Sequence, residues 1–442
     1  MAFNIITTVI GVAVGLGLVI LVHEWGHFMV AKAFGVRVDV FSIGFGPRLF
    51  GVKKGTTDYR ISALPVGGYV RMAGDSSFEE RKHEPDELLS KPRWQRVLVA
   101  LAGPAMNILT ALVIVAGVSM YGTEEPAYLD QQIQIAGVFP DSPAQQAGFQ
   151  PGDHIVELDG VQNPTWDRLR LDLLFSIPGN SLQATVDRNG TLLPVKIEAG
   201  MDEISAVGFP VPPQVLIGDV ISGSPADRSG LKPGDHVLSL DGSPISNPAD
   251  LSTRVQQSGG RPIQLLIDRG GHQRLIEVRA ARGESPRGGQ IWQIGVEIGP
   301  DFPTIMRSYS LLGAIGHSVE FNMYLTKQIV YIVGDLFRGK VSLKQLEGPL
   351  GIARESGRAA RGGARELLLL MAAISLNLAV VNLLPFGPLD GGHILLLAIE
   401  GGMRHDLSMR VKERFVTVSV VFLLLVFGVV MYNDVLRLFP HH

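Results

Sequence analysis

Cysteine is absent from this sequence of 442 residues. Disulfides are therefore excluded, and any zinc site must use histidine and carboxylate ligands. Charge is also scarce, because Asp, Glu, Lys and Arg make up 18% of the chain against 46% for hydrophobic residues, and the mean hydropathy is +0.24. That balance is too apolar for an ordinary soluble protein and indicates several membrane spans. The net charge of −3 gives no reason to expect a nucleic acid partner.

Four stretches are long and apolar enough to cross a bilayer as helices. They are residues 1–22, continuing as helix to residue 34, and residues 97–121, 367–389 and 415–433. A cleaved signal peptide is the alternative for the first stretch, but the basic residues that begin a signal peptide are missing.

Lysine and arginine gather in two loops between these stretches. Eleven lie between Arg37 and Arg96, and four lie in the loop of residues 394–414. Short loops rich in Lys and Arg stay on the cytoplasmic side of a membrane. We therefore expect both loops in the cytoplasm and both termini outside.

The region between the second and third stretches contains a repeat. Residues 142–160, SPAQQAGFQPGDHIVELDG, return as residues 224–242, SPADRSGLKPGDHVLSLDG. Each copy reads as a short helix, a Pro-Gly-Asp turn and an alternating strand that ends at Asp-Gly. Two copies are too few for a solenoid, so we expect two small domains, at residues 125–212 and 213–300. The motif resembles PDZ domains, which bind an extended peptide at a sheet edge; spacers with closed grooves are the alternative.

His23-Glu24-Trp25-Gly26-His27 is an H-E-x-x-H motif at the end of the first stretch. On a helix, this spacing puts both imidazoles on one face, able to share a metal ion, with Glu24 placed to take a proton from metal-bound water. Three ionisable side chains this deep in a membrane helix need a compensating partner, which a divalent metal provides. Two histidines that pack between helices are the alternative.

A catalytic zinc ion usually has three protein ligands and a water, so the third ligand should come from another span. Asp390 is the first charged residue after the apolar run of the third span, and Pro385 and Pro388 interrupt the helix just before it. A membrane tolerates such a break only beside protein or a water-filled cavity. We therefore expect Asp390 to be the third ligand. The alternatives are that Asp390 only caps the span, or that His393, which we place behind the ligands, binds the metal instead.

HEWGH together with NLLPFGPLDGGH (residues 382–393) resembles the motifs of the site-2 protease family of intramembrane zinc proteases, and the PDZ-like repeat resembles its bacterial members. The resemblance covers nearly the whole chain. It implies a Zn²⁺ cofactor with the ligands His23, His27 and Asp390, and Glu24 as the catalytic base. It also implies that Asn382 holds or polarises the substrate.

Two further segments carry candidate substrate-binding residues. Asn107 ends the segment GPAMN, which resembles another family motif, although close helix packing is the alternative. Residues 35–96 read as short strands and hairpins. A protease must bind its substrate extended, and a strand edge offers an unwound substrate new backbone partners. In the family a Gly-x-Gly β-region has this role, so Gly44, Gly46 and Tyr69 are candidates; an ordinary cytoplasmic hairpin is the alternative.

These observations predict an α-helical polytopic membrane protein with four transmembrane helices, a cytoplasmic-side β-region and two periplasmic PDZ-like α/β domains. We expect a zinc endopeptidase of the bacterial inner membrane. The resemblance implies that it cleaves single-span membrane proteins, such as a trimmed anti-sigma factor, and remnant signal peptides, while the PDZ-like pair binds peptides or proteins. A non-catalytic scaffold is the main alternative. A metal-coupled transporter is another, but the transmembrane stretches show no internal repeat.

Residues 308–334 are apolar but are interrupted by His317, Glu320 and Lys327, so we expect region 301–366 to form interfacial helices. The metal site requires this reading. His23 and Asp390 lie toward the C-terminal ends of their spans, so both reach one metal only if those spans run in the same direction. A crossing at residues 308–334 would reverse the third span and separate the two residues by about 30 Å.

The variants Ser308→Cys and Gly339→Cys test this topology, since the chain has no other cysteine. Both should react with a membrane-impermeant thiol reagent in cells whose outer membrane is permeabilised. Labelling at position 308 alone, with position 339 reached only after lysis, would show a crossing and exclude Asp390 as the third ligand.

Overall fold

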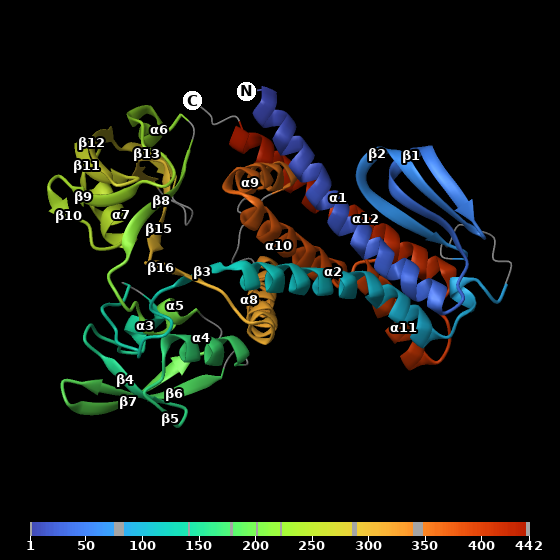
Figure 1. The fold of residues 1–442 in the computed structure, drawn as a ribbon, viewed down its shortest axis with the longest axis horizontal. Coiled ribbons are helices and arrows are strands. Elements are labelled where there is room, and N and C mark those ends of the chain that lie inside the picture. Colours follow the sequence, from blue (N-terminus) through green and yellow to red (C-terminus); the bar gives the residue numbers. More distant parts are fainter. Residues whose placement is uncertain are drawn as a thin grey trace. The chain divides into compact units, whose positions relative to one another are not determined.

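The chain forms two compact units, Met1–Thr123 with Ser308–His441, and Glu124–Arg307 (Figure 1). The first unit contains the long helices and the second contains the sequence repeat. The computed structural model describes residues 2–74, 84–139, 142–176, 180–199, 202–221, 223–284, 290–338 and 348–438.

Helices dominate the first unit. Its α-helices are α1 (Ala2–Ala33), α2 (Arg93–Tyr121), α8 (Leu311–Phe337), α9 (Pro349–Gly362), α10 (Ala364–Asn382), α11 (Asp390–Met403) and α12 (Met409–Leu438). Of the helices searched over the described residues, α2, α10 and α12 are long and apolar enough to cross a membrane. They correspond to three of the four predicted spans. The remaining predicted span, the first along the chain, is α1, with 32 residues. The side chains of its residues 2–16 lie outside the described part of the chain. The count of four spans stays a prediction.

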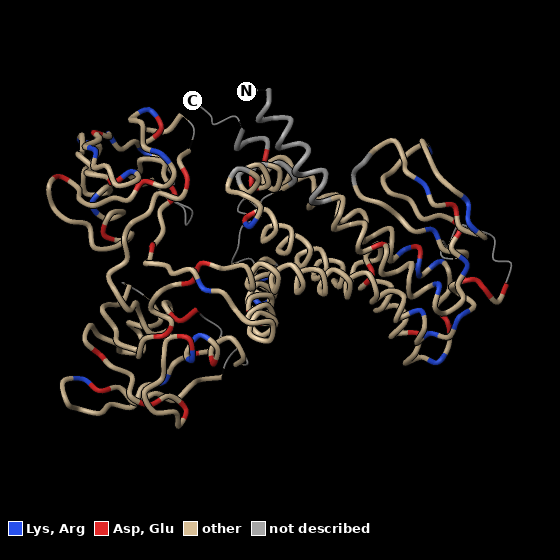
Figure 2. Tube along the Cα trace, in the orientation of Figure 1, with Lys and Arg blue, Asp and Glu red and all other residues tan. Residues whose placement is uncertain are grey.

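Charged residues follow the pattern expected of such helices. Lys, Arg, Asp and Glu are nearly missing along α2 and α10, and they gather where α11 and the β-region lie (Figure 2). Arg93 at the start of α2 forms an ion pair of 2.8 Å with Asp406, which follows α11. The uncharged lengths of these helices are the parts that suit a bilayer core.

Helix α8, whose position we predicted to be interfacial, is not among the candidate spans found in the described residues. It packs on α2 through polar contacts, since Ser318 Oγ donates to the carbonyl oxygen of Leu112 at 2.7 Å and Ser119 Oγ lies 2.8 Å from Nδ1 of His317. In Figure 1, α8 is foreshortened where α2 is seen from the side, so the two helices cross. Its position relative to a bilayer stays a prediction, and Gly339 lies outside the described residues.

The third span ends earlier than we predicted. Helix α10 stops at Asn382, the chain turns through Pro385 and Pro388, and α11 begins at Asp390. The prediction of a loop over residues 394–414 was wrong for residues 394–403, which belong to α11. The run Ile-Leu-Leu-Leu-Ala-Ile at residues 394–399 has no helix breaker, so the helix continues through it and ends at Met403, before Arg404 with its positive φ of 60°.

The predicted β-region is a sheet of β1 (Val38–Lys54) and β2 (Thr57–Met72). The first part of β1 lies between two parts of β2, because Phe41 is paired with both Tyr59 and Val70. Gly44 allows the strand to bend, since it has a positive φ of 85° and a Cβ there would lie 2.4 Å from the carbonyl oxygen of Leu64. Residues 68–72 of β2 are paired on one side only within the described sheet, and β2 packs against α1.

The sequence repeat of the second unit is also a structural repeat. The first lobe consists of α3 (Pro143–Gln146), β4 (His154–Leu158), β5 (Val161–Gln162), α4 (Trp166–Phe175), β6 (Ser181–Arg188), β7 (Thr191–Glu198) and α5 (Glu203–Val207). The second consists of β8 (Gln214–Val220), α6 (Pro225–Ser229), β9 (His236–Leu240), β10 (Ser243–Pro244), α7 (Pro248–Gln257), β11 (Pro262–Arg269), β12 (His272–Arg279), β13 (Ala281–Glu284), β14 (Gln290–Gln293) and β15 (Val296–Asp301). The strand order β5-β4-β6-β7 returns as β10-β9-β11-β12, and each lobe has its own hydrophobic core.

The Pro-Gly-Asp turns of the two lobes are held by the same ion pair. Asp153 is fully buried and accepts from Arg188 Nε at 2.7 Å, and Asp235 accepts from Arg269 Nε at 2.6 Å. Burial alone would raise the pKa of Asp235, but hydrogen bonds from Arg269 and from the backbone N–H of Lys232 outweigh it and hold that pKa below its usual value. The same buried ion pair therefore stabilises the turn in both lobes, which accounts for an aspartate at this position of each repeat.

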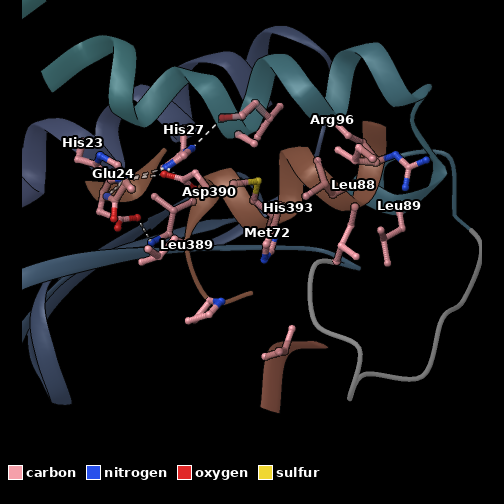
Figure 3. Close-up of a pocket in the computed structure, with 18 of the residues that line it drawn as sticks. His23, Glu24, His27, Met72, Leu88, Leu89, Arg96, Leu389, Asp390 and His393 are labelled. Atoms are coloured by element: carbon pink, nitrogen blue, oxygen red, sulfur yellow. Dashed lines mark hydrogen bonds and ion pairs between the residues drawn. The ribbon is translucent and has the colours of Figure 1, made fainter. Parts of the chain in front are cut away.

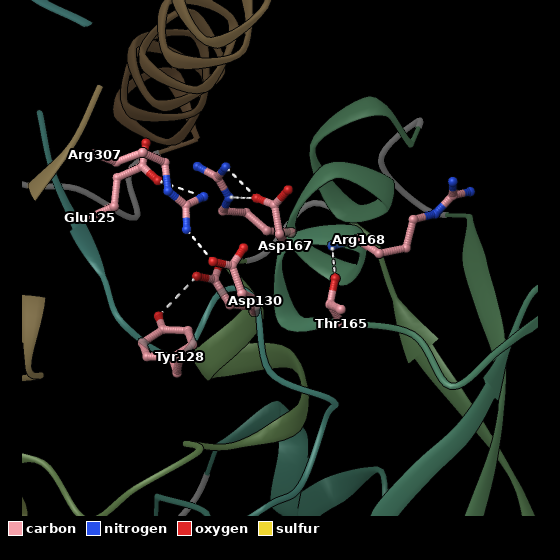
Figure 4. Close-up of polar contacts among 9 residues, drawn as sticks. Glu125, Tyr128, Asp130, Thr165, Asp167, Arg168 and Arg307 are labelled. Atoms are coloured by element: carbon pink, nitrogen blue, oxygen red, sulfur yellow. Dashed lines mark hydrogen bonds and ion pairs between the residues drawn. The ribbon is translucent and has the colours of Figure 1, made fainter. Parts of the chain in front are cut away.

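The chain enters and leaves the second unit through two paired strands, β3 (Thr123–Pro126) and β16 (Thr304–Arg307). Arg307 forms one ion pair within this stem, with Glu125, and a second with Asp130 beyond it (Figure 4). The assignment of the lobes as PDZ domains stays a prediction.

Candidate metal centre and active site

The H-E-x-x-H motif lies on α1, and its two imidazoles meet the carboxylate that begins α11. Nε2 of His23 and Nε2 of His27 are 3.1 Å apart. Asp390 reaches both, with Oδ2 at 3.2 Å from His23 Nε2 and Oδ1 at 3.4 Å from His27 Nε2. Among the described residues, this cluster is the group of His, Cys, Asp or Glu side chains placed closely enough to hold a metal ion.

The spacing of these three donors suits a tetrahedral metal ion. Metal–ligand bonds of about 2.0 Å, as zinc makes to nitrogen and oxygen, put two tetrahedral ligands about 3.3 Å apart. The imidazole nitrogens, 3.1 Å apart, lie close to that edge, and each is 3.2 or 3.4 Å from a different oxygen of Asp390. One ligand atom of each of the three residues lies within 4.8 Å of the others, so a small shift of the carboxylate completes the geometry. The two histidines are 6% and 7% exposed, so water does not screen the lone pairs that face each other. A cation between the donors removes this repulsion.

One face of α2 orients both histidines. Nδ1 of His27 lies 2.7 Å from the carbonyl oxygen of Val99, so this nitrogen carries the proton and Nε2 keeps its lone pair. Nδ1 of His23 lies 3.2 Å from the side-chain amide of Asn107. Val99, Gly103 and Asn107 follow each other at intervals of four, so they share one face of the helix. The intervals match those of His23 and His27 on α1.

Glycine makes the close approach of α1 and α2 possible. A Cβ at Gly103 would lie 2.3 Å from His27 Nε2 and 2.7 Å from His23 Nε2. A Cβ at Gly26 would lie 2.4 Å from the backbone oxygen of Ala102. Real side-chain atoms do not approach this closely, so both positions exclude any larger residue unless the helices separate.

Glu24 lies beside the two histidines and contacts the β-region. Its carboxylate accepts a hydrogen bond of 3.0 Å from the backbone N–H of Val70. Val70 belongs to residues 68–72 of β2, the part of the sheet that is paired on one side only. The sheet edge therefore reaches the candidate active site (Figure 3).

A cavity of about 480 Å³ opens on this cluster (Figure 3). All four residues of the predicted centre line it, together with Val70 and Met72 from the sheet edge and Leu88 and Leu89 beyond it. It extends toward Arg96, Glu400 and Lys412, where Lys412 Nζ and the buried Glu400 form an ion pair of 2.6 Å. The space beside the cluster is thus lined by both apolar and charged groups.

The other predicted residues take different places. Asn382 lines the cavity, with Nδ2 at 3.2 Å from His23 Nε2, and His393 lines it without joining the ligand cluster. Asn107 is fully buried and is not among the lining residues. Gly44, Gly46 and Tyr69 belong to the β-region but do not line the cavity, and Tyr69 is hydrogen-bonded to Arg60.

Sequence reasoning missed Val99, Val70 and the charged pair of Glu400 and Lys412. Val99 and Val70 act through backbone groups, for which no side-chain motif exists. A glutamate at the end of an apolar helix was the available signal for Glu400.

Comparison with known proteins decides the family. The model of peptidase family M50 matches residues 11–426. The chain belongs to this family. This M50 peptidase is 32% identical over 447 residues to the regulator of sigma-E protease RseP of Salmonella typhimurium, covering 96% of this chain and 97% of the relative. RseP of Escherichia coli is 32% identical over 446 residues, with 96% and 97% covered. A Neisseria meningitidis protein whose name proposes a zinc metalloprotease is 30% identical over 439 residues, with 95% and 97% covered.

The comparisons confirm the family predicted from HEWGH and the residue 382–393 motif, and with it the prediction of a site-2-type metalloprotease. They establish the activity of the chain as a whole, that of a metalloprotease. The roles of single residues stay proposals.

The variant Gly103→Ala tests the geometry that α2 imposes. The added methyl group displaces both imidazoles, and misplacement by about 1 Å lowers turnover by about 100-fold. Gly117→Ala is the matched control, because a Cβ at this position of the same helix meets nothing within 4 Å. Cleavage of a model single-span substrate in detergent should be lost in the first variant and kept in the second. Equal activity of the two variants would contradict the close contact.

Proposed function

We propose that this M50 peptidase is an intramembrane zinc endopeptidase in which His23, His27 and Asp390 hold Zn²⁺ and Glu24 is the general base. The observation that carries the proposal is the convergence of two buried imidazoles and the Asp390 carboxylate, with one ligand atom of each residue within 4.8 Å of the others and both histidine Nδ1 atoms engaged elsewhere. Zinc bound there would polarise the scissile carbonyl and lower the pKa of a bound water.

Two side chains beside the ligands have the roles of proton transfer and substrate binding. Glu24, on the helical turn between the two histidines, takes a proton from the attacking water and delivers it to the leaving amine. Asn382 has an amide within 3.2 Å of His23 Nε2, so it is placed to hydrogen-bond a substrate carbonyl beside the ligands. Both residues line the cavity that a substrate must enter.

The sheet edge would hold the substrate extended. A helical peptide bond is shielded by its own hydrogen bonds, whereas a strand paired with residues 68–72 presents its backbone to the metal site. Val70 offers its N–H on the cavity side, where Glu24 now accepts it. We infer that a bound substrate strand competes for this N–H. Gly44 and Gly46 would contribute by bending β1, the strand paired with residues 68–72. Tyr69 lies next to Val70 in that edge segment of β2.

Substrates and location follow from the relatives' names and the charge pattern. Relatives named regulators of sigma-E protease suggest single-span membrane substrates, such as anti-sigma factors and remnant signal peptides. The lobes at residues 125–212 and 213–300 are proposed to be periplasmic PDZ-like domains that bind peptides or exclude bulky substrates. The protein would lie in the bacterial inner membrane, with both termini in the periplasm.

Glu24→Gln should abolish cleavage while zinc stays bound, because the ligands remain and only the base is removed. We expect turnover to fall by about 100- to 10,000-fold, the usual contribution of general base catalysis. The measurement is cleavage of a purified single-span substrate, with elemental analysis of the same sample. Turnover near the wild-type rate would remove Glu24 from the mechanism.

Asp390→Ala should lower both zinc content and activity, because a ligand is removed. Elemental analysis after dialysis against a weak chelator distinguishes this variant from Glu24→Gln, which serves as its control. Zinc occupancy equal to that of Glu24→Gln would move the third ligand to His393 or to another residue.

A further inference from the structure

Asn107 was a candidate for substrate contact, but the structure places it behind the metal site. Its side chain is fully buried and does not line the cavity. Its amide faces Nδ1 of His23 at 3.2 Å, on the side of the ring away from Asp390. The amide thus touches a proposed metal ligand and has no access to the substrate.

The orientation of this amide matters for the tautomer of His23. If Nε2 of His23 binds the metal, Nδ1 carries the proton and must donate it. As placed, Asn107 turns Nδ2, a donor, toward this nitrogen, while Oδ1 is buried without a hydrogen-bond partner among the described residues. Nitrogen and oxygen of an amide have nearly the same shape, and partners decide which way it points. Exchanging the two atoms gives the proton of Nδ1 an acceptor and gives the orphaned oxygen a donor.

We propose that Asn107 is a positioning residue whose Oδ1 accepts the Nδ1 proton of His23 and so directs the Nε2 lone pair to the metal. The inference rests on the proposed zinc site. It makes the two histidines equivalent, since each donates from Nδ1 to an oxygen on the same face of α2: the carbonyl of Val99 for His27, and the amide of Asn107 for His23.

A third helix contacts the backbone of Asn107. Its backbone carbonyl accepts a hydrogen bond of 2.9 Å from Ser375 Oγ of α10, and Ser375 is fully buried. This contact involves the backbone of Asn107 and does not involve His23. Ser375→Ala therefore removes a buried polar contact in the same layer without changing the acceptor.

The test is the zinc dissociation constant of purified full-length protein, measured by competition with a chromophoric chelator. Asn107→Leu keeps similar size but has no acceptor, and loss of such a partner weakens metal binding by about 10- to 100-fold. Asn107→Asp keeps an acceptor oxygen and should bind zinc at least as tightly as wild type. Ser375→Ala should match wild type.

The outcomes separate this inference from the proposed function. Wild-type affinity in Asn107→Leu would overturn the positioning role. Equal weakening of zinc binding in Asn107→Asp and Asn107→Leu would overturn the acceptor role. Thermal unfolding of both variants without metal measures their stability, and this conclusion holds whichever of the two is more stable. No zinc binding by wild type would instead reject the metal site itself. Weakening in Asn107→Leu alone supports the proposal.

Discussion

The close antiparallel contact of α1 and α2 is the constraint on which the centre depends. Membrane helices gain little from the hydrophobic effect, so small residues that let backbones approach closely are what brings them together. Gly26 on α1 and Gly103 on α2 provide that approach, since a side chain at either would meet atoms of the other helix within 2.4 Å. At this distance one face of α2 supplies an oxygen or amide to each histidine, and the imidazoles converge.

The second constraint is the break between α10 and α11. Asp390 reaches the histidines because the chain turns sharply after Asn382 and begins a new helix. Gly391 and Gly392 are packed against this turn, where an added Cβ would lie 2.2 Å from the carbonyl oxygen of Leu383 and 2.0 Å from that of Phe386. The glycines after the aspartate therefore permit the turn that places the third donor. An unbroken helix through Pro385 would carry the aspartate away from α1.

Sequence reasoning succeeded where side-chain chemistry leaves a pattern. His23, Glu24 and His27 have helical spacing, and Asp390 follows an apolar run, so their convergence was predictable from motif and depth. It failed where backbone or geometry decides. Val99 and Val70 contribute a carbonyl and an amide, which every residue possesses, and the folding of β1 between two parts of β2 depends on positive-φ glycines within an ordinary strand pattern. Helix α11 was missed because Asp390 was taken as the end of a span, whereas it begins a helix.

The central claim is that two histidines and one aspartate bind a single zinc ion. X-ray absorption at the zinc edge of the Glu24→Gln protein, loaded with one equivalent of zinc, tests it most directly. The account predicts scattering from two imidazoles, with the remaining ligands oxygen, at distances of about 2.0–2.2 Å. A third imidazole, or fewer than two, would contradict it.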